Sequence, residues 1–283
     1  MYSANFDYYQ PKTLNEALAL LKKNKNAKIL AGGHSLLPAM KLRQALPKVL
    51  VDIGKLKLSG IKATKTSINI GALTTHAELA VSKVLMSKCP ILSEAALQIG
   101  DTQVRNRGTI GGSLAHADPA ADLPTVLMAL GAKFVTSSKR SIAAEKFFVD
   151  LFATALKSGE VLTEIQVPIM AKGIGGAYLK HRHPASSYAV VGVAAIVGVK
   201  DGKCSHASIV VGGATTNPVR AVAAEKALMG NSLDDATISA AVAKVAEAIK
   251  DPLGDIYASG EYRTHLATVL AGRALKLAAE RAS

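Results

Sequence analysis

The chain has 283 residues, of which 49% are hydrophobic and 19% are charged. A composition this apolar builds a folded core and excludes a mainly disordered or collagen-like chain, and the length allows two domains because single cores seldom grow past about 250 residues. The formal net charge of +13 raises the question of an anionic partner, such as nucleic acid, a membrane surface or an acidic protein.

The two cysteines, Cys89 and Cys204, lie far apart in the sequence and belong to no Cys-x-x-Cys pair. Iron–sulfur clusters and structural zinc sites need several ligands, so we expect no metal centre in this chain. The first residues, MYSANFDYYQPKT, lack the basic end and apolar run of a signal peptide. The most apolar stretch, 188–199, is too short for a transmembrane segment. We therefore expect a cytoplasmic protein, either free or on the inner face of the membrane.

Residues 1–57 are predicted to form a small βαβ unit. A capping box at Thr13-Leu14-Asn15-Glu16 opens a helix. Residues 27–31 and 49–53 are short apolar runs typical of buried strands, and a Gly-Gly turn and a short helix lie between them. This order of elements favours parallel pairing of the two strands.

Residues 58–172 are predicted to add a mixed or antiparallel sheet with helices. The pattern indicates a hairpin over 61–70, a helix opened by the capping box Thr75-His76-Ala77-Glu78, a helix at 90–99, a helix from Asp122 as N-cap to Gly131, and strands at 133–136 and 161–167. Residues 100–124 are rich in Gly, Asp and Pro and predict a long irregular loop, a kind of segment that is usually functional.

Residues 173–283 are predicted to form a second domain, with the boundary in the segment 168–176. A three-stranded antiparallel sheet is expected at 177–181, 189–199 and 205–211, with a tight turn at Asp201-Gly202. A three-helix bundle is expected at 218–229, 233–250 and 261–281. The fold class predicted for the whole chain is therefore α+β.

Two segments carry adjacent glycines beside a hydroxyl residue, Ala31-Gly32-Gly33-His34-Ser35 and Thr109-Ile110-Gly111-Gly112-Ser113. Glycines between a strand and a helix let backbone N–H groups approach an anion such as a diphosphate. One such pair is more often a simple tight turn, and neither segment matches the usual dinucleotide or nucleotide-hydrolase loops. Two in one domain favour a single extended cofactor lying between them.

These segments carry a resemblance. AGGHSLLPAMKLR (31–43) and QVRNRGTIGGSLAHADPAADLP (103–124) resemble the FAD-binding medium subunit of molybdenum hydroxylases of the aerobic carbon monoxide dehydrogenase and xanthine dehydrogenase type. The segments EVLTEIQVP, AYLKHR with SYAVVGVAA, and DIYASGEYRTHLATVLAGRAL are similar to later parts of that family, so nearly the whole chain is covered. His34 and Ser113 depart from it, since many relatives have Gln and Asn there.

The resemblance implies an FAD-binding domain of the vanillyl-alcohol-oxidase (PCMH) type at 1–172 and a CO-dehydrogenase-flavoprotein-like domain at 173–283. It implies that main-chain groups of the two loops hold the FAD diphosphate, at Ala31, Gly32, Gly33, His34, Ser35, Leu36, Leu37, Thr109, Gly111, Gly112 and Ser113.

Four side chains elsewhere in the sequence complete the implied site. Asp122 would accept a hydrogen bond near the flavin, or would serve only as an N-cap. Leu162 would pack on the cofactor from the domain edge. Lys180 takes the family's basic position near the flavin, unless it is a surface lysine, and Tyr188 would lie beside the isoalloxazine, unless it is a core aromatic. No residue is assigned a catalytic role.

Other polar groups support competing sites less well. His181 and His183 share a strand face as a metal pair would, but no acidic or cysteine ligand is near them in sequence. His116 and Asp118 are better explained by the second glycine loop. Arg105 and Arg107 could bind phosphate or a partner chain, although loop arginines are commonly solvated. No Ser/His/Asp grouping or carboxylate pair stands out.

The resemblance implies an oxidoreductase component, an FAD-carrying electron-transfer subunit. Its partners would be a large molybdopterin subunit and a small subunit with two [2Fe-2S] clusters, in a dimer of heterotrimers. A stand-alone FAD oxidase or reductase of the same fold is the first alternative. A nucleic-acid-binding protein is the second, disfavoured because seven Tyr, five Phe and no Trp make a stacking surface sparse. The substrate stays open between carbon monoxide, an aldehyde, a purine and another heterocycle.

Overall fold

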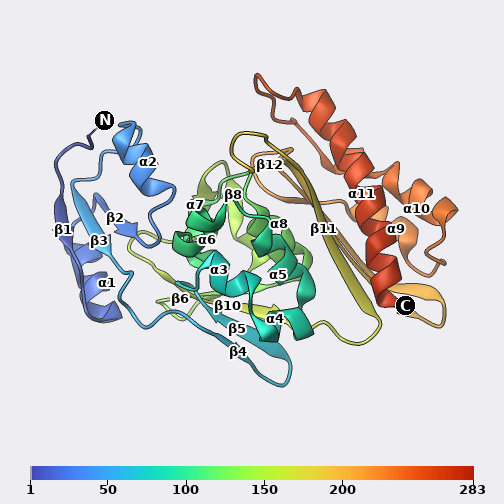
Figure 1. Ribbon diagram of the computed structural model, residues 1–283, viewed down its shortest axis with the longest axis horizontal. Helices are drawn as coiled ribbons and strands as arrows, with labels where there is room; N and C mark the ends of the chain where they lie inside the picture. Colours follow the sequence, from blue (N-terminus) through green and yellow to red (C-terminus); the bar gives the residue numbers. More distant parts are fainter. Residues whose placement is uncertain (1) are drawn as a thin grey trace.

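The computed structural model describes residues 2–283. Three units follow one another along the long axis of the molecule, with the N-terminal strands at one end and the C-terminal helices at the other (Figure 1). The predicted α+β class is confirmed. Within residues 2–283, none of the helices combines the length and the apolar character needed to cross a bilayer.

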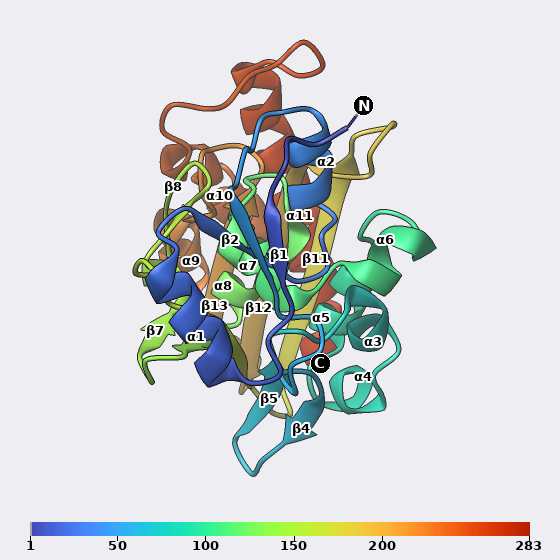
Figure 2. The ribbon, with the colours of Figure 1, turned by 90° about the vertical axis from the view of Figure 1, so that its left-hand side faces the viewer.

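The N-terminal unit is the predicted parallel βαβ arrangement with one additional strand. Its sheet has the order β1-β3-β2, with both pairs parallel. The elements are β1 (Asp7–Tyr9), α1 (Leu14–Lys23), β2 (Ala27–Leu30), α2 (Leu36–Lys41) and β3 (Val49–Asp52). Strand β1 was not predicted, because its three residues are all exposed and carry no apolar signal. In the side view, α2 lies above the three strands and α1 below them (Figure 2).

The central unit is built on a five-stranded antiparallel sheet with the order β4-β5-β10-β6-β7. The strands are β4 (Ile61–Ala63), β5 (Ser67–Gly71), β6 (Lys133–Thr136), β7 (Ser141–Ala143) and β10 (Leu162–Pro168). A separate hairpin joins β8 (Phe148–Asp150) to β9 (Ala153–Thr154), after a 3-10 turn, η1, at Ala144–Lys146. The predicted hairpin at 61–70 is confirmed, whereas β7, β8 and β9 were not predicted.

Six helices cover this sheet, and two of them correct the sequence analysis. They are α3 (His76–Ala80), α4 (Lys83–Lys88), α5 (Pro90–Leu97), α6 (Thr102–Arg107), α7 (Ile110–His116) and α8 (Asp122–Ala129). The prediction of an irregular loop over 100–124 was wrong, because Asp101 caps α6 and Thr109 caps α7. Glycines in the first turn of α7 concealed that helix from a propensity argument.

The start of α8 also differs from the prediction. Ala121 is the N-cap residue, and Asp122 is the first residue of the helix. The Asp122 carboxylate bonds the side chains of Tyr178 and Lys180 instead of the α8 backbone. The prediction that Asp122 caps the helix was therefore wrong, because a tertiary ion pair takes its carboxylate.

The C-terminal unit contains a meander of three long strands plus one short strand, with three helices. The elements are β11 (Ile174–Arg182), β12 (Ala189–Lys200), β13 (Lys203–Gly212), β14 (Val219–Arg220), α9 (Val222–Leu228), α10 (Asp235–Val242), η2 (Val245–Ala248) and α11 (Gly260–Ala282). Asp201 and Gly202 turn the β12–β13 hairpin with φ of 51° and 73°, as predicted. The helix predicted at 233–250 ends at Val242 and continues only as the 3-10 turn η2.

The C-terminal sheet is apolar on both faces because both are covered. On one face Ala194, Ile196 and Val210 join the core of the central unit. On the other face Val193, Ala195 and Ile209 join a second core with α9, α10 and α11. Burial on both faces explains the nearly continuous apolar run of β12. Because one face of this sheet packs on the central unit, the turn between β11 and β12 is also held in place relative to that unit. This turn carries Tyr188, one of the candidate site residues.

Candidate functional site

The two glycine loops lie against each other. A Cβ atom on Gly32 would lie only 2.0 Å from the carbonyl oxygen of Arg107 and 3.0 Å from the Cα of Gly108. At Gly112, a Cβ would lie 4.0 Å from the Cβ of Ala31. The backbone of the first loop, Ala31–Ser35, is therefore packed against the backbone of Arg107 and Gly108, which directly precede the second loop, Thr109–Ser113. Only glycine fits at position 32.

The first loop presents unpaired backbone donors. The N–H groups of Gly32, Gly33, His34 and Ser35 have no hydrogen-bond acceptor within residues 2–283. Gly33 has a φ of 80°, a conformation that strains any residue with a side chain. Its Cβ would also lie 2.9 Å from Cδ1 of Leu37, which packs beneath the loop. A run of free N–H groups on a fixed turn is a suitable cradle for an anion.

Most backbone N–H groups of the second loop donate hydrogen bonds to other groups of the protein. Its N–H groups at Ile110 and Gly111 donate to the carbonyls of Thr74 and Ala72, at 2.9 and 2.8 Å. The N–H of Gly112 donates to Oγ1 of Thr109 at 3.1 Å, and that of Ser113 donates to the Thr109 carbonyl at 3.0 Å. Free donors were predicted in this loop. In the structure these N–H groups are instead paired with protein acceptors, so the second loop is a fixed surface beside the first loop.

His76 belongs to the same place, and the sequence analysis did not assign it a role. Its N–H donates to the Gly108 carbonyl at 2.9 Å, and a Cβ on Gly108 would lie 2.6 Å from Cδ2 of its ring. Burial, with a smaller effect of nearby His34, lowers the pKa of His76 to about 4, so the ring is neutral at pH 7. The capping box that contains His76 marked the start of a helix but not its contact with the loop.

Asp122 and Lys180 form a buried ion pair. The Lys180 Nζ lies 2.8 Å from Oδ1 of Asp122, and the side chain of Lys180 is 0% exposed. The Tyr178 hydroxyl donates to Asp122 Oδ1 at 2.6 Å. Burial raises the pKa of Asp122 and lowers that of Lys180, while each partner's charge acts against that shift. Lys180 is therefore not a surface lysine, and protein groups already bond the carboxylate of Asp122.

Tyr188 lies beside the first glycine loop. The residue is 42% exposed, so it is not a core aromatic. Burial of the phenol and the nearby carboxylate of Asp118 raise the pKa of Tyr188, and the neighbouring Ser35 hydroxyl acts in the opposite direction. The effect of Ser35 on this pKa places Tyr188 near the end of the first glycine loop, although the two residues lie far apart in the sequence.

The other residues singled out in the sequence are Leu162, His181 and His183. Leu162 is 5% exposed within the core of the central unit and does not lie on an open domain edge. The rings of His181 and His183 both approach Tyr257, with centroids 6.3 and 4.8 Å away. In the described part of the chain, no group of three or more His, Cys, Asp or Glu residues is placed to hold a metal.

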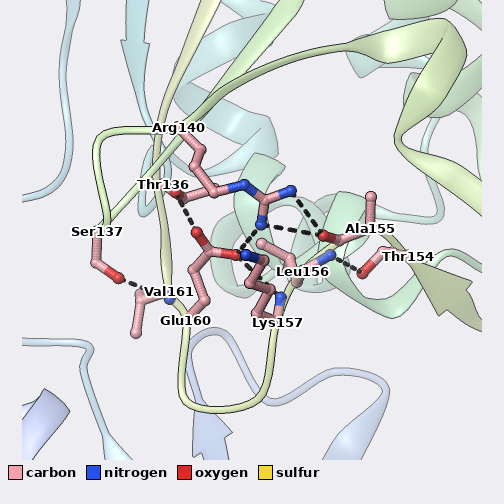
Figure 3. Close-up of polar contacts among 9 residues, drawn as sticks. All are labelled: Thr136, Ser137, Arg140, Thr154, Ala155, Leu156, Lys157, Glu160 and Val161. Carbon is pink, nitrogen blue, oxygen red and sulfur yellow. Dashed lines mark hydrogen bonds and ion pairs between the residues drawn. The ribbon is translucent and has the colours of Figure 1, made fainter.

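A polar cluster precedes Leu162 at the start of β10. The Glu160 carboxylate accepts hydrogen bonds from Thr136 Oγ1 at 2.6 Å, Arg140 Nη1 at 2.7 Å and the Lys157 N–H at 2.9 Å (Figure 3). Burial acts to raise the pKa of Glu160, but these bonds hold it below its ordinary value. Arg140 also donates to the Ala155 carbonyl, so the cluster ties two turns to the sheet.

Comparisons with known proteins identify the family of the chain. Residues 4–170 match the FAD binding domain in molybdopterin dehydrogenase. Residues 176–278 match the CO dehydrogenase flavoprotein C-terminal domain. The chain belongs to this flavoprotein family. The resemblance seen in the two glycine loops is thereby confirmed, and FAD is identified as the cofactor of this family.

The relatives match over their full length. The chain is 40% identical over 287 residues to the carbon monoxide dehydrogenase medium chain of Afipia carboxidovorans, covering 100% of this chain and 99% of the relative. It is 38% identical over 280 residues to the glyceraldehyde dehydrogenase medium chain of Sulfolobus acidocaldarius, covering 98% and 99%. The solved carbon monoxide dehydrogenase of Hydrogenophaga pseudoflava matches with a TM-score of 0.96 and 39% identity over 100% of both chains. These relatives are dehydrogenases, so the family is one of oxidoreductases.

Proposed function

We propose that the FAD diphosphate binds between the two glycine loops and that this chain is the electron-transfer subunit of a molybdenum hydroxylase. The observation that carries the proposal is the contact of the loops together with the free N–H groups of Gly32–Ser35. These donors can bond an anion without breaking any existing backbone hydrogen bond. The residues present thus fit a dinucleotide diphosphate.

The two loops have different roles in holding the cofactor. In this proposal Gly32, Gly33, His34 and Ser35 donate to the diphosphate, with Ala31, Leu36 and Leu37 shaping the turn. Thr109, Gly111, Gly112 and Ser113 form the opposing wall, and Tyr188 lies beside the flavin ring. Bound FAD supplies a centre that accepts and releases electrons. The protein fixes its position and excludes water from one side.

Three predicted residues take other positions in the proposal. Asp122 and Lys180 support the site from behind, because both are buried. Leu162 is nearly buried, so only the small exposed part of its side chain would contact the cofactor. The cofactor domain of the proposal comprises residues 1–172, with subdomains 1–57 and 58–172, and residues 173–283 form the second domain.

The names of the relatives support a complex. Several are called medium chains, which suggests a large and a small partner. We infer a large subunit with a molybdopterin cofactor and a small subunit with two [2Fe-2S] clusters, in a cytoplasmic dimer of heterotrimers. Cys89 and Cys204 are 0% and 2% exposed, so neither thiol is placed to bind a cluster. Electrons would pass from a partner cluster to the FAD of this chain and then to an external acceptor.

Isolation of the native protein through a tag on this chain tests the proposal. We expect a flavin spectrum, two co-purifying subunits, and bleaching of the flavin when the complex receives its substrate. A single chain that oxidises a substrate alone would instead support a stand-alone flavin oxidase. A colourless chain that binds DNA with a steep salt dependence would support the nucleic-acid alternative.

A further inference from the structure

The ammonium of Lys180 joins three separate parts of the molecule. Its Nζ lies 2.8 Å from the Asp122 carboxylate of α8. It also donates to the Gln98 carbonyl after α5 at 3.0 Å and to the Ser187 carbonyl at 2.7 Å. An ammonium has three N–H donors, so these acceptors use its whole capacity. With its side chain 0% exposed, Lys180 has no donor left for a cofactor.

The Ser187 carbonyl belongs to the turn that carries Tyr188. In this turn the Ser187 N–H donates to the His183 carbonyl at 2.9 Å, and the His183 N–H donates to the Tyr188 carbonyl at 2.8 Å. Ser187 has a φ of 60°, in the left-handed region that costs a non-glycine residue about 1 kcal/mol or more. The strained residue is thus the one that Lys180 holds.

The turn is also fixed at its far end. The Ala189 N–H donates to the Ala120 carbonyl at 3.1 Å, just before Asp122 begins α8. The turn is therefore held at two points, by the Ala120 carbonyl just before α8 and by Lys180, which Asp122 holds. Tyr188 lies between these two attachments, at Ser187 and Ala189.

We propose that Lys180, held by Asp122, is a positioning residue that fixes the turn 183–189 and with it Tyr188. The inference rests on the proposed FAD site, because the purpose of the fixed tyrosine is to flank the flavin. Lys180 would act on the cofactor only through Tyr188. If Lys180 instead contacted FAD directly, its removal would weaken FAD binding whether or not Tyr188 is present.

Replacing both partners tests the proposal without leaving a buried charge. Removing Lys180 alone would strand the Asp122 carboxylate and could unfold the protein, whereas exchange of a whole buried pair is often tolerated. The test variant is Asp122→Asn with Lys180→Met, which keeps an acceptor for Tyr178. The control is Arg220→Met with Glu225→Gln, a pair in the same unit whose Nη2 and Oε2 atoms lie 2.6 Å apart.

Two measurements on the full-length protein, isolated with its natural subunits, decide the matter. Amide hydrogen exchange at 183–189 should become about tenfold faster in the test variant and stay unchanged in the control. The FAD dissociation constant should rise about tenfold, as for the loss of one charge-assisted hydrogen bond. In a Tyr188→Ala background the same pair exchange should leave the FAD dissociation constant unchanged.

Either of two results would overturn the inference. One is unchanged exchange at 183–189 in a folded test variant, which would show that the turn needs no tether. The other is an equal loss of FAD affinity with and without Tyr188, which would show that Lys180 does not act through it. If the wild-type protein binds no FAD, the proposed function fails, while the exchange measurement still decides whether Lys180 holds the turn.

Discussion

Substitution of Gly32 by Ala is predicted to separate the two glycine loops. The added Cβ would lie 2.0 Å from the Arg107 carbonyl oxygen, whereas ordinary C···O contacts are about 3.3 Å. The neighbouring atoms are backbone and cannot rotate away, so the loops must move apart by roughly 1 Å. Overpacking of this kind costs about 1–3 kcal/mol of folding free energy.

The matched control is Gly202→Ala in the β12–β13 turn. Gly202 has a φ of 73° and nothing within 4 Å of its Cβ position, so its substitution adds backbone strain alone. Flavin content per chain, read from visible absorbance after gel filtration, should fall strongly for Gly32→Ala and stay at the wild-type value for Gly202→Ala. Full flavin content and an unchanged unfolding midpoint in Gly32→Ala would refute the contact between the loops.

Three further predictions concern the same region. Bulky substitution of Gly33 or Gly112 should abolish FAD retention in the native complex, as measured by its flavin absorbance. A Cβ at Gly33 would lie 2.9 Å from Cδ1 of Leu37 on a backbone with positive φ, and a Cβ at Gly112 would lie 2.8 Å from Oγ1 of Thr109, so each substitution would distort its loop. The pKa of His76 is lowered from 6.5 to about 4 in the folded protein. Between these two pH values the unfolded state therefore binds more protons at His76 than the folded state does. The free energy of unfolding should fall by about 3 kcal/mol in total as the pH drops from 6.5 to 4. Urea unfolding of His76→Gln should show a smaller acid loss than wild type, and an identical loss would contradict the assignment. Glu160→Gln should lower the free energy of unfolding by about 1–3 kcal/mol, because Arg140 loses its buried charged partner, and thermal unfolding of the variant measures this loss.

Local sequence signals predicted much of the framework. The Thr75–Glu78 capping box forms both of its reciprocal hydrogen bonds, and the Asp201-Gly202 turn has the positive φ values that such hairpins need. The two glycine loops were predicted to face one ligand, and the structure packs the first loop at Gly32 against the residues that directly precede the second. In each case the signal depends on residues close together in the sequence.

Predictions failed where distant contacts decide the structure. Asp122 has the residue type and place of an N-cap, but its carboxylate bonds Lys180 and Tyr178 on another unit. The free donors were expected in both loops, yet Gly111 donates to Ala72 after β5. Neither pairing has a local signature, because each depends on how helices and sheets pack.

The charge of the chain now has a more specific interpretation. In the proposed site the diphosphate is held by backbone N–H groups, which carry no formal charge, so the cofactor accounts for little of the net charge of +13. Apart from the buried side chains of Lys180 and Arg263, most basic side chains lie at the surface and are available to solvent or to an acidic partner. An acidic partner surface is the complement that this charge predicts.

A structure determined with FAD bound tests the central claim most directly. The account predicts that the two phosphates accept hydrogen bonds from the backbone N–H groups of Gly32–Ser35, with Thr109–Ser113 on the opposite side and the flavin ring beside Tyr188. A diphosphate bound away from these N–H groups, or FAD held by another part of the chain, would contradict it.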